Sequence, residues 1–447
     1  MSQQTSAQLQ ESAASVASIA RRARAASRQL AKLSAETRNE VLMAAAQALE
    51  QGAARILEAN ERDSRAAHEA VTAGKMSSAM FARLRVTERG IAQMATQVRE
   101  VARLEDPLGR RLAATELDDK LVLYKESCPF GVVGVVFESR PDVVPQLASL
   151  GLKSGNAVIL KGGSEAAQTN DAIVSLWREC LGRFPAVPAD SINLLQTRAD
   201  VLELLALDRD VDLIIPRGSY ELVHFIMEHS RIPVLGHSEG ICHVYVDRAA
   251  DMKKAVDIAY DAKVQYPAVC NAAETLLVHE AIAQQFLPRI AAKLQEAGVE
   301  IRGCAKTLAL LPGASIVPAT ETDWSTEYGD LILSVKIVAD LDEAIGHINR
   351  YGSRHTDAIV TEDSEAARRF MNEVDSAGVF QNASTRFADG YRYGLGAEVG
   401  ISTSKLHARG PMGLEGLTTY KYKLFGDGHT VASYAKGEKK FKHRRLP

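Results

Sequence analysis

Cys270 stands where a cysteine can act as a nucleophile. It lies in the segment QYPAVCNAAETLLV, in a loop in which Pro267 precedes a predicted strand. A thiolate in such a loop is open to a substrate, whereas most cysteines are buried and inert. The next residue, Asn271, supplies an amide side chain and a backbone N–H that could hold an oxyanion. We interpret Cys270 as a candidate nucleophile, with a buried structural cysteine as the alternative.

The other cysteines give no sign of chemistry, and nothing suggests a metal site. They are widely spaced, the total of five is odd, and no pair forms C-x-x-C: Cys128, Cys180, Cys242 and Cys304. This spacing argues against a disulfide framework and a zinc site, and it suits a reducing cytoplasm. The eleven histidines show no H-E-x-x-H or similar ligand pattern, so we predict no metal.

Two predicted strand–helix junctions carry a cation and a hydroxyl. Lys161-Gly162-Gly163-Ser164 closes one strand and opens a helix, and Pro216-Arg217-Gly218-Ser219 repeats the arrangement one unit later. Helix N-terminal amides there suit a ribose hydroxyl or a phosphate. The alternative is an ordinary turn with Ser164 and Ser219 as helix caps. The G-x-G-x-x-G fingerprint is missing, so the chain either binds no dinucleotide or binds one without glycine-cradled pyrophosphate.

Residues 382–422 form a glycine-rich segment that also concentrates cations. It begins at Asn382 and contains the basic residues Arg386, Arg392, Lys405, His407 and Arg409. Glycine lets the backbone approach a ligand, and cations together with amides suit an anionic group. We therefore interpret the segment as part of a binding site rather than as a spacer.

Length and composition limit the classes of partner. The chain has 447 residues, which predicts two or three domains, and 46% of them are hydrophobic. A net charge of -3 provides no field for a polyanion, so we expect no nucleic-acid partner. No run of 18 apolar residues exists, so we predict no membrane-spanning segment. The basic residues 436–445 are interpreted as a solvated tail or an edge strand.

The first quarter of the chain changes pattern near Arg110. Residues 5 to about 105 are rich in alanine and predicted to be helical, beginning with a helix whose apolar residues include Leu9 and Val16. Residues 110–127 alternate around Asp118-Asp119, which predicts a long β-hairpin. Because such a hairpin has no core of its own, we expect it to pair with another subunit.

Short apolar runs then alternate with helical stretches, which predicts parallel sheets covered on both faces. The first set of runs is 131–137, 156–161, 191–195, 211–216 and 243–247. The second set, from about residue 250, is 272–279, 308–311, 333–338 and 356–361. We predict two α/β domains that face each other across a cleft, where cofactor and substrate meet.

Four motifs in order are specific enough to name a family. They are PFGVVGVVFESRPDV, VILKGGSEA, Q-x-P-x-V-C-N-A-x-E-T-L-L-V and STRFADG…GLGAEVGISTSKLHARGPMGLEGLTTYK. Together they resemble the gamma-glutamyl phosphate reductases of the aldehyde dehydrogenase superfamily, from about residue 10 to residue 425. The resemblance implies an α/β fold with two parallel-sheet domains and a β-hairpin oligomerisation arm. The implied parts are a dinucleotide-binding domain (1–109 and 129–249), a catalytic cysteine domain (250–395), a return segment to the cofactor domain and cleft (396–424) and the arm (110–128 and 425–447).

The resemblance also implies roles for single residues. Cys270 matches the catalytic cysteine, Lys161 matches a lysine at the adenine-side ribose, and Gly218-Ser219 matches the turn beside the nicotinamide. Glu327 in TEYGD resembles the glutamate that holds the nicotinamide ribose. Ser139 stands where most of the superfamily has an oxyanion-hole asparagine, so that function is expected at Asn271 or a backbone amide.

The implied activity is NADPH-dependent reduction of L-glutamyl 5-phosphate to L-glutamate 5-semialdehyde through a thioester on Cys270, in proline biosynthesis. The residues expected to bind phosphate or the substrate's carboxylates are Ser139, Arg140, Asn382, Arg386, Lys405, His407 and Arg409. The sequence leaves NADP or NAD, and dimer or tetramer, open. A cytoplasmic homo-oligomer that contacts the glutamate kinase making its substrate is the further expectation.

One departure bears on the competing activities. Hydrolytic members of the superfamily carry E-L-G-G-K, whose glutamate activates water, whereas this chain has VLGHSEGICH (234–243) with Glu239 out of register. This favours release of phosphate, because activated water would destroy the thioester. The alternatives are a hydrolytic NAD-dependent aldehyde dehydrogenase and, more remotely, a non-catalytic nucleotide-binding protein on the same scaffold.

Overall fold

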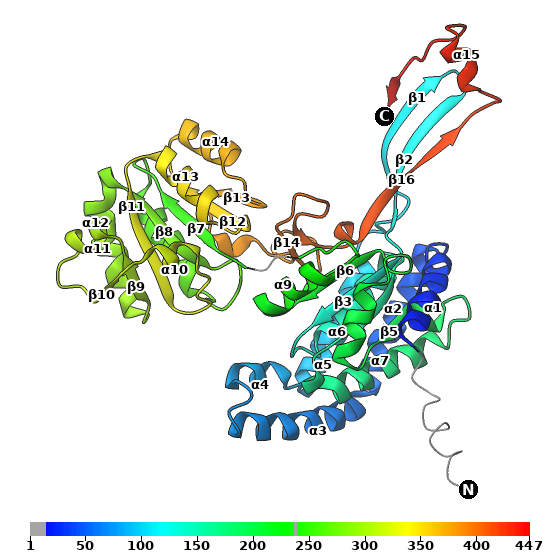
Figure 1. Cartoon of the computed structure of the whole chain (residues 1–447), viewed down its shortest axis with the longest axis horizontal. Coiled ribbons are helices and arrows are strands. Elements are labelled where there is room, and N and C mark those ends of the chain that lie inside the picture. Colours follow the sequence, from blue (N-terminus) through cyan, green and yellow to red (C-terminus); the bar gives the residue numbers. More distant parts are fainter. Residues whose placement is uncertain (1–14, 237–238) are drawn as a thin grey trace. The chain divides into compact units, whose positions relative to one another are not determined.

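The structure, a computed structural model, describes residues 15–236 and 239–447, which form two compact units (Figure 1). The first unit comprises the chain up to Leu235 together with Gly413–Pro447, and the second comprises Gly236–Met412. The division therefore falls at residue 236 rather than at the expected residue 250.

The N-terminal helices belong to the first unit and confirm the helical prediction. They are α1 (Val16–Leu30), α2 (Ala35–Gln51), α3 (Ala53–Thr72), α4 (Ser78–Leu84) and α5 (Glu88–Arg103). Ser15, Ser34 and Thr87 each cap a helix by accepting a backbone N–H on the side-chain oxygen, which satisfies a donor that the helix itself leaves free. Leu9, expected in the first helix, lies outside the described residues.

A four-stranded parallel sheet forms the centre of the first unit, in the order β5-β4-β3-β6. Its strands are β3 (Val132–Phe137), β4 (Ala157–Lys161), β5 (Ile192–Leu194) and β6 (Leu213–Arg217). The helices between them are α6 (Val143–Lys153), α7 (Ala167–Leu181), α8 (Arg198–Leu205) and α9 (Tyr220–His229). Every residue of β3 and β4 is buried, as expected for parallel strands covered on both faces. The carboxyl ends of β3, β4 and β6 therefore share one edge.

The predicted hairpin is present, but its partners belong to its own chain. Strands β1 (Arg111–Asp118) and β2 (Leu121–Pro129) pair antiparallel, with Lys120 at a φ of 56° in the turn. Strand β16 (Thr418–Phe425) pairs with β2 along its whole length, and β17 (Arg444–Leu446) pairs with β1 (Figure 1). The expected arm of residues 110–128 with the C-terminal segment is therefore present within one chain, while pairing with another subunit stays a prediction. The C-terminal part of the arm begins at residue 418 rather than at the expected residue 425, because the whole of β16 pairs with β2.

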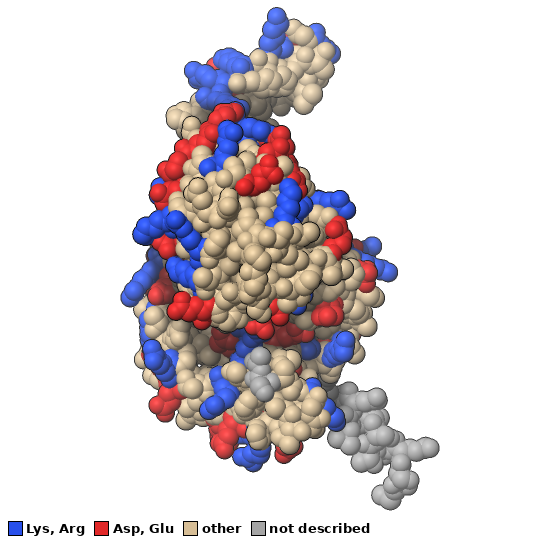
Figure 2. All heavy atoms as spheres, turned by 90° about the vertical axis from the view of Figure 1, so that its left-hand side faces the viewer, with Lys and Arg blue, Asp and Glu red and all other residues tan. Residues whose placement is uncertain are grey.

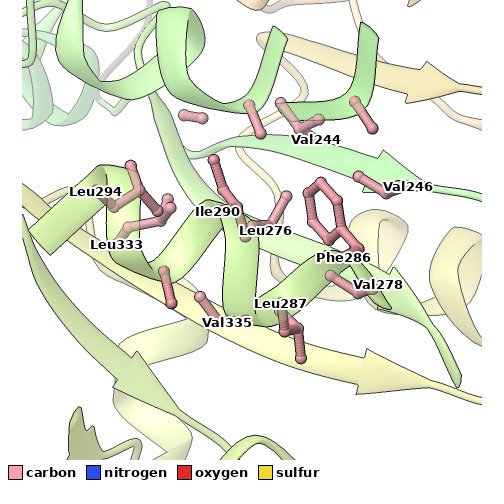
Figure 3. Close-up of a cluster of buried hydrophobic side chains, with 14 of the residues drawn as sticks. Val244, Val246, Leu276, Val278, Phe286, Leu287, Ile290, Leu294, Leu333 and Val335 are labelled. Atoms are coloured by element: carbon pink, nitrogen blue, oxygen red, sulfur yellow. The ribbon is translucent and has the colours of Figure 1, made fainter. Parts of the chain in front are cut away.

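The second unit contains a seven-stranded parallel sheet in the order β10-β9-β11-β8-β7-β12-β13. The strands are β7 (Cys242–Val246), β8 (Ala273–His279), β9 (Glu300–Gly303), β10 (Ile316–Pro318), β11 (Ile332–Val338), β12 (Thr356–Val360) and β13 (Gly378–Gln381). The helices that alternate with them are α10 (Met252–Val264), α11 (Glu280–Glu296), α12 (Ala305–Leu310), α13 (Leu341–Tyr351) and α14 (Ser364–Glu373). One core packs Phe286 and Ile290 of α11 against the buried valines and leucines of the sheet (Figure 3).

Two predictions for this unit were wrong. The run 243–247, assigned to the first domain, is β7, which pairs with β8 and β12. The run 308–311, predicted as a strand, falls mostly in α12. Both errors have one cause, since an apolar run of four or five residues does not reveal which partner buries it. The edge strands β10 and β13 and the neighbouring strand β9 were missed because each has only three or four residues and too few apolar positions to form a recognisable run.

Charges of both signs are interspersed over the face of the second unit (Figure 2). No field of a single sign gathers there to attract a polyanion. None of the helices in the described ranges combines the length and apolar content needed to cross a bilayer.

Candidate active site

Lys161 ends β4 at the carboxyl edge of the first unit's sheet. Its side chain is buried, and Nζ donates a hydrogen bond to the carbonyl oxygen of Gly162 at 2.5 Å. Burial lowers the pKa of Lys161, while the nearby charges of Glu165 and Asp200 act in the opposite direction. An enclosed ammonium group at a strand end is placed to bind a hydroxyl or phosphate of a ligand.

Ser139 follows β3 and is held by a carboxylate that the sequence analysis missed. Its backbone N–H and its hydroxyl both donate to Oε1 of Glu165, at 2.8 and 2.5 Å. Ser139 also has a φ of 39°, in the left-handed region that is unfavourable for serine. A Cβ on Gly163 would lie 2.0 Å from the same Oε1, so a larger residue there would displace this carboxylate from Ser139. The hydroxyl of Ser139 is therefore used within the turn.

Ser219 lies at the third strand end and caps α9. Its backbone N–H donates to Oε2 of Glu138 at 2.7 Å, and its hydroxyl accepts from the N–H of Leu222. A Cβ on Gly218 would approach the same Glu138 oxygen to 2.4 Å. Ser164 differs, because it begins a short 3-10 turn and α7 starts only at Ala167. Of the two serine caps that the alternative interpretation required, only the one at Ser219 is present.

These strand ends fit a dinucleotide. In open parallel sheets, ligands bind outside the carboxyl ends of the strands. Lys161 offers a cation, the Gly162–Ser164 turn offers backbone close to the edge, and Glu165 offers an acceptor for ribose hydroxyls. The signals that could have found Glu138 and Glu165 are the acidic residues in FESRP and GGSEA.

In the second unit, Cys270 lies in the loop between α10 and β8, in direct contact with Gly240. An ideal Cβ on Gly240 would lie 2.1 Å from the carbonyl oxygen of Cys270, 2.4 Å from its Cα and 2.5 Å from its Cβ. Real Cβ atoms do not come so close to backbone, so this position requires glycine. Gly240 was not predicted from the sequence, although it is the second glycine of the VLGHSEGICH segment.

Asn271 and Thr385 join the loop of Cys270 to the glycine-rich segment. Nδ2 of Asn271 donates to the carbonyl oxygen of Ala388 at 2.8 Å, and Oγ1 of Thr385 donates to that of Asn271 at 2.7 Å. Both side chains are buried, and Oδ1 of Asn271 has no hydrogen-bond partner among the described residues. The side chain thus uses one amide hydrogen to hold its own loop.

Arg386 is a predicted cation that forms a hydrogen bond with this loop. It is buried, and its Nε donates to Oε1 of Gln265, which lies in the same loop as Cys270, at 2.9 Å. Burial and Arg392 lower the pKa of Arg386, whereas the charges of Asp389 and Cys270 raise it. A guanidinium in this position could attract an anion to the loop of Cys270.

Known relatives identify the fold and the family. The aldehyde dehydrogenase family matches residues 2–302. The chain belongs to this family. It is 56% identical over 426 residues to a gamma-glutamyl phosphate reductase of Natronomonas pharaonis, covering 95% of this chain and 96% of that one. It is 54% identical to the Acaryochloris marina enzyme of the same name, covering 97% and 99%. A crystal structure of a Thermotoga maritima gamma-glutamyl phosphate reductase superimposes with a TM-score of 0.90 at 42% identity, covering 93% and 100%.

This aldehyde dehydrogenase is therefore an oxidoreductase of a family that uses a nicotinamide cofactor, and the predicted α/β class is confirmed. A glyceraldehyde-3-phosphate dehydrogenase of Methanocaldococcus jannaschii, crystallised with NADP, shares the fold with a TM-score of 0.63 at 16% identity. Among the residues that the structure describes, no three His, Cys, Asp or Glu side chains gather as a metal site would require.

The remaining predicted cations of this aldehyde dehydrogenase have acidic partners. Lys405 and Arg409 both bind Asp375, at 2.7 and 3.3 Å. Arg140 pairs with Asp142 at 3.0 Å. Cations that were expected to bind an anionic ligand therefore already contact carboxylates, although Lys405 and Arg409 share a single one.

The other predicted residues of the site are Asn382, His407 and Glu327. Asn382 has a φ of 52° and exchanges two hydrogen bonds with the backbone of Thr361 at the end of β12, so its amide is used within the fold. His407 is exposed. Glu327 is exposed near Glu239, whose pKa is raised by burial and by the charge of Glu327.

Proposed function

We propose that this aldehyde dehydrogenase reduces L-glutamyl 5-phosphate to L-glutamate 5-semialdehyde, the second step of proline biosynthesis from glutamate. The relatives' shared name, gamma-glutamyl phosphate reductase, and identities of 54–56% over most of the chain support this substrate. The single observation that carries the chemistry is the loop of Cys270, which packs on Gly240 and lies beside Arg386.

The chemistry begins with Sγ of Cys270. The thiolate attacks the acyl carbon, the bond from that carbon to the phosphate oxygen breaks, and inorganic phosphate leaves with the electron pair. A bound nicotinamide cofactor supplies the hydride that reduces the acyl carbon. The carbon–sulfur bond then breaks, its electron pair returns to Sγ, and the aldehyde leaves. Arg386 stabilises the negative charge of the departing phosphate, because a guanidinium binds phosphate oxygens in pairs.

Arg386 is the strongest candidate for binding the anionic substrate, because no carboxylate in the part of the chain that the structure describes forms an ion pair with it. Its neighbour in the loop is the uncharged Gln265, whereas Lys405 and Arg409 share Asp375 and Arg140 has Asp142. We propose that Arg386 binds the phosphate, and that Lys405 and Arg409 contact the substrate's carboxylate only by giving up Asp375. The backbone N–H groups around Cys270 and Asn271 remain the candidates for the oxyanion.

The decisive test is the phosphate dependence of the reverse reaction. In semialdehyde oxidation the rate should rise with inorganic phosphate and saturate, and arsenate should replace phosphate. Saturation separates a bound phosphate from salt screening. Arg386→Gln should raise the half-saturating phosphate concentration about tenfold or more, because a charge-assisted pair is lost. Arg409→Gln, the matched control, should raise it less.

Oxidation to glutamate in phosphate-free buffer, at a rate that phosphate does not change, would contradict the proposed reaction. It would assign the chain to the hydrolytic, NAD-dependent alternative. Glu239 would then be the first residue to consider as the base, since it precedes the glycine that touches Cys270 and its pKa is raised.

We further propose that the cofactor is NADPH, held at the strand ends by Lys161, Gly162, Ser164, Gly218 and Ser219, with Glu327 at the nicotinamide ribose. Lys161→Ala should raise the KM for NADPH about tenfold while changing kcat little, because its contact is remote from the reacting carbon. A smaller rise with NADH would support a 2′-phosphate contact. Equal rises would restrict Lys161 to the ribose, and an unchanged KM for both cofactors would exclude a contact.

Assembly and location follow as proposals from the arm and the cysteines. Strand β16 exposes Tyr422, Leu424 and Phe425, which suits a homo-oligomer whose copy number light scattering would give. All five cysteines are free thiols, which suits a location in the cytoplasm. Contact there with the kinase that makes the acyl phosphate would shorten the time that the substrate spends in water.

A further inference from the structure

A buried ion pair joins the two ends of the loop that carries Cys270. Lys263 lies in the last turn of α10, and Glu274 is the second residue of β8. Nζ of Lys263 lies 2.6 Å from Oε2 of Glu274, and the two side chains are 0% and 1% exposed. Eight of the ten residues between them, 265–272, form the nucleophile loop that links α10 to β8.

Glu274 also holds a second loop through its other oxygen. Oε1 accepts a hydrogen bond from the backbone N–H of Gly329 at 3.3 Å, and Gly329 has a φ of 60° that suits glycine. Gly329 lies two residues after Glu327. One carboxylate therefore contacts both Lys263, at the base of the nucleophile loop, and the loop that carries Glu327 (residues 326–331).

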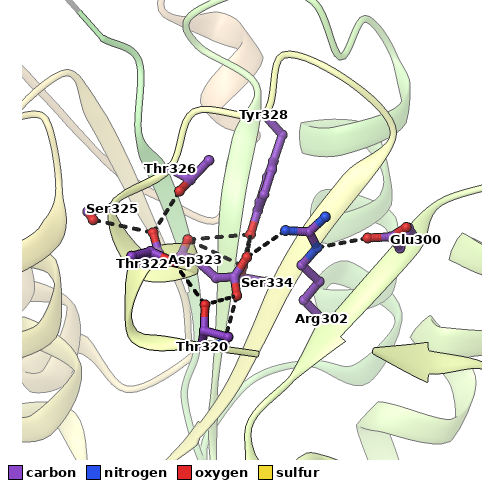
Figure 4. A network of polar contacts seen from close by, with 9 residues as sticks. All are labelled: Glu300, Arg302, Thr320, Thr322, Asp323, Ser325, Thr326, Tyr328 and Ser334. Atoms are coloured by element: carbon purple, nitrogen blue, oxygen red, sulfur yellow. Dashed lines mark hydrogen bonds and ion pairs between the residues drawn. The ribbon is translucent and has the colours of Figure 1, made fainter. Parts of the chain in front are cut away.

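The residue between these two, Tyr328, is held by a separate polar network (Figure 4). Its hydroxyl lies 2.7 Å from Oδ1 of Asp323 and 2.7 Å from Oγ of Ser334. Arg302 donates to Asp323 at 2.7 Å. The network holds Tyr328 to the sheet, whereas the next residue, Gly329, is held by Glu274, whose other oxygen binds Lys263.

Stability alone does not explain this ion pair, because burying two charges costs desolvation free energy that their attraction barely recovers. Burial raises the pKa of Glu274 to about 7 and lowers the pKa of Lys263, while the attraction between the two charges opposes both changes. Apolar residues of similar volume stabilise such positions as well or better in other proteins. An apolar side chain at position 274, however, could not bind Lys263 and the backbone N–H of Gly329 at the same time, as the two oxygens of Glu274 do.

We propose that Lys263 and Glu274 are positioning residues that fix the nucleophile loop and the Glu327 loop in one mutual arrangement. Neither touches the reacting atoms. Their effect on turnover rests on the proposed function, whereas their effect on the loops does not.

The test measures amide hydrogen exchange in the full-length protein. In the double variant Lys263→Met with Glu274→Leu, exchange should rise about tenfold or more in both loops and stay unchanged in β7 and β8. The variant leaves no buried charge unpaired, so it should remain folded. In Lys263→Met with Glu274→Gln, the amide oxygen can still accept from Gly329, so only the nucleophile loop should exchange faster.

Tyr245→Phe is the matched control. It removes a buried hydrogen bond from Tyr245 to Asp247 in the same sheet without touching either loop. Neither loop should exchange faster in this variant. The proposal would be overturned if exchange in the Met/Leu variant stayed unchanged in either loop or rose throughout the domain. Faster exchange of the loops in Tyr245→Phe would also overturn it.

Kinetics separate positioning from stability. The Met/Leu variant should lose about tenfold or more in kcat with the KM for the acyl phosphate within about threefold of wild type, and Tyr245→Phe should change neither. An unchanged kcat in a variant with loosened loops would refute the catalytic part. If wild-type protein shows no phosphate-dependent activity, the proposed function fails while the exchange result still decides the positioning.

Discussion

Cys270→Ala should lower kcat by more than about 100-fold, a loss of at least ~2.7 kcal/mol of barrier stabilisation, because the covalent step disappears with the sulfur. The fold should persist, since Cys270 is partly exposed in a loop that Gly240, Asn271 and Thr385 hold through backbone and side-chain contacts of their own. Steady-state rates, thermal unfolding and cofactor titration would measure the three properties separately.

Cys304→Ala serves as the control, because the Cys304 thiol is also partly exposed but forms a hydrogen bond with the hydroxyl of Thr307. It should retain wild-type kcat. A Cys270→Ala enzyme that keeps more than about one per cent of the wild-type rate would rule out the thioester route, since so small a loss is less than a nucleophile provides.

Gly240→Ala should be the second most damaging single change, with kcat reduced about tenfold or more and the protein still folded. The new methyl group would lie within 2.5 Å of the carbonyl oxygen, Cα and Cβ of Cys270, so the nucleophile loop must move. A displacement of about 1 Å at a reacting group can cost 100-fold in rate. Rates and the thermal midpoint, measured together, would distinguish displacement from unfolding.

Gly346→Ala is the matched control. Gly346 lies inside α13, and a Cβ there would meet no atom within 4 Å. Alanine should therefore stabilise the protein by about 0.5–1 kcal/mol, through the lower entropy of the unfolded chain, without changing kcat. If Gly240→Ala left kcat as unchanged as this control, the contact between Gly240 and Cys270 would have no part in positioning the nucleophile.

The sequence by itself determined the features that local pattern controls. Alternation around Asp118-Asp119 predicted the hairpin, and the strand–helix rhythm predicted parallel sheets, because side-chain periodicity and turn chemistry act over a few residues. The loop of Cys270 and the strand end at Lys161 were found in the same way, from a residue type in a local context. The family followed from motifs that are long enough to be specific.

Only the tertiary structure decided which distant segments meet. The apolar run of β7 carries no mark of the sheet it joins, and nothing in the sequence shows that Asp375 pairs with both Lys405 and Arg409. Gly240 and Glu274 act through partners about 30 and 55 residues away, at Cys270 and Gly329. Such contacts depend on how the sheets bring loops together, and burial, charge pairing and close approach are properties of that arrangement rather than of any short stretch of chain.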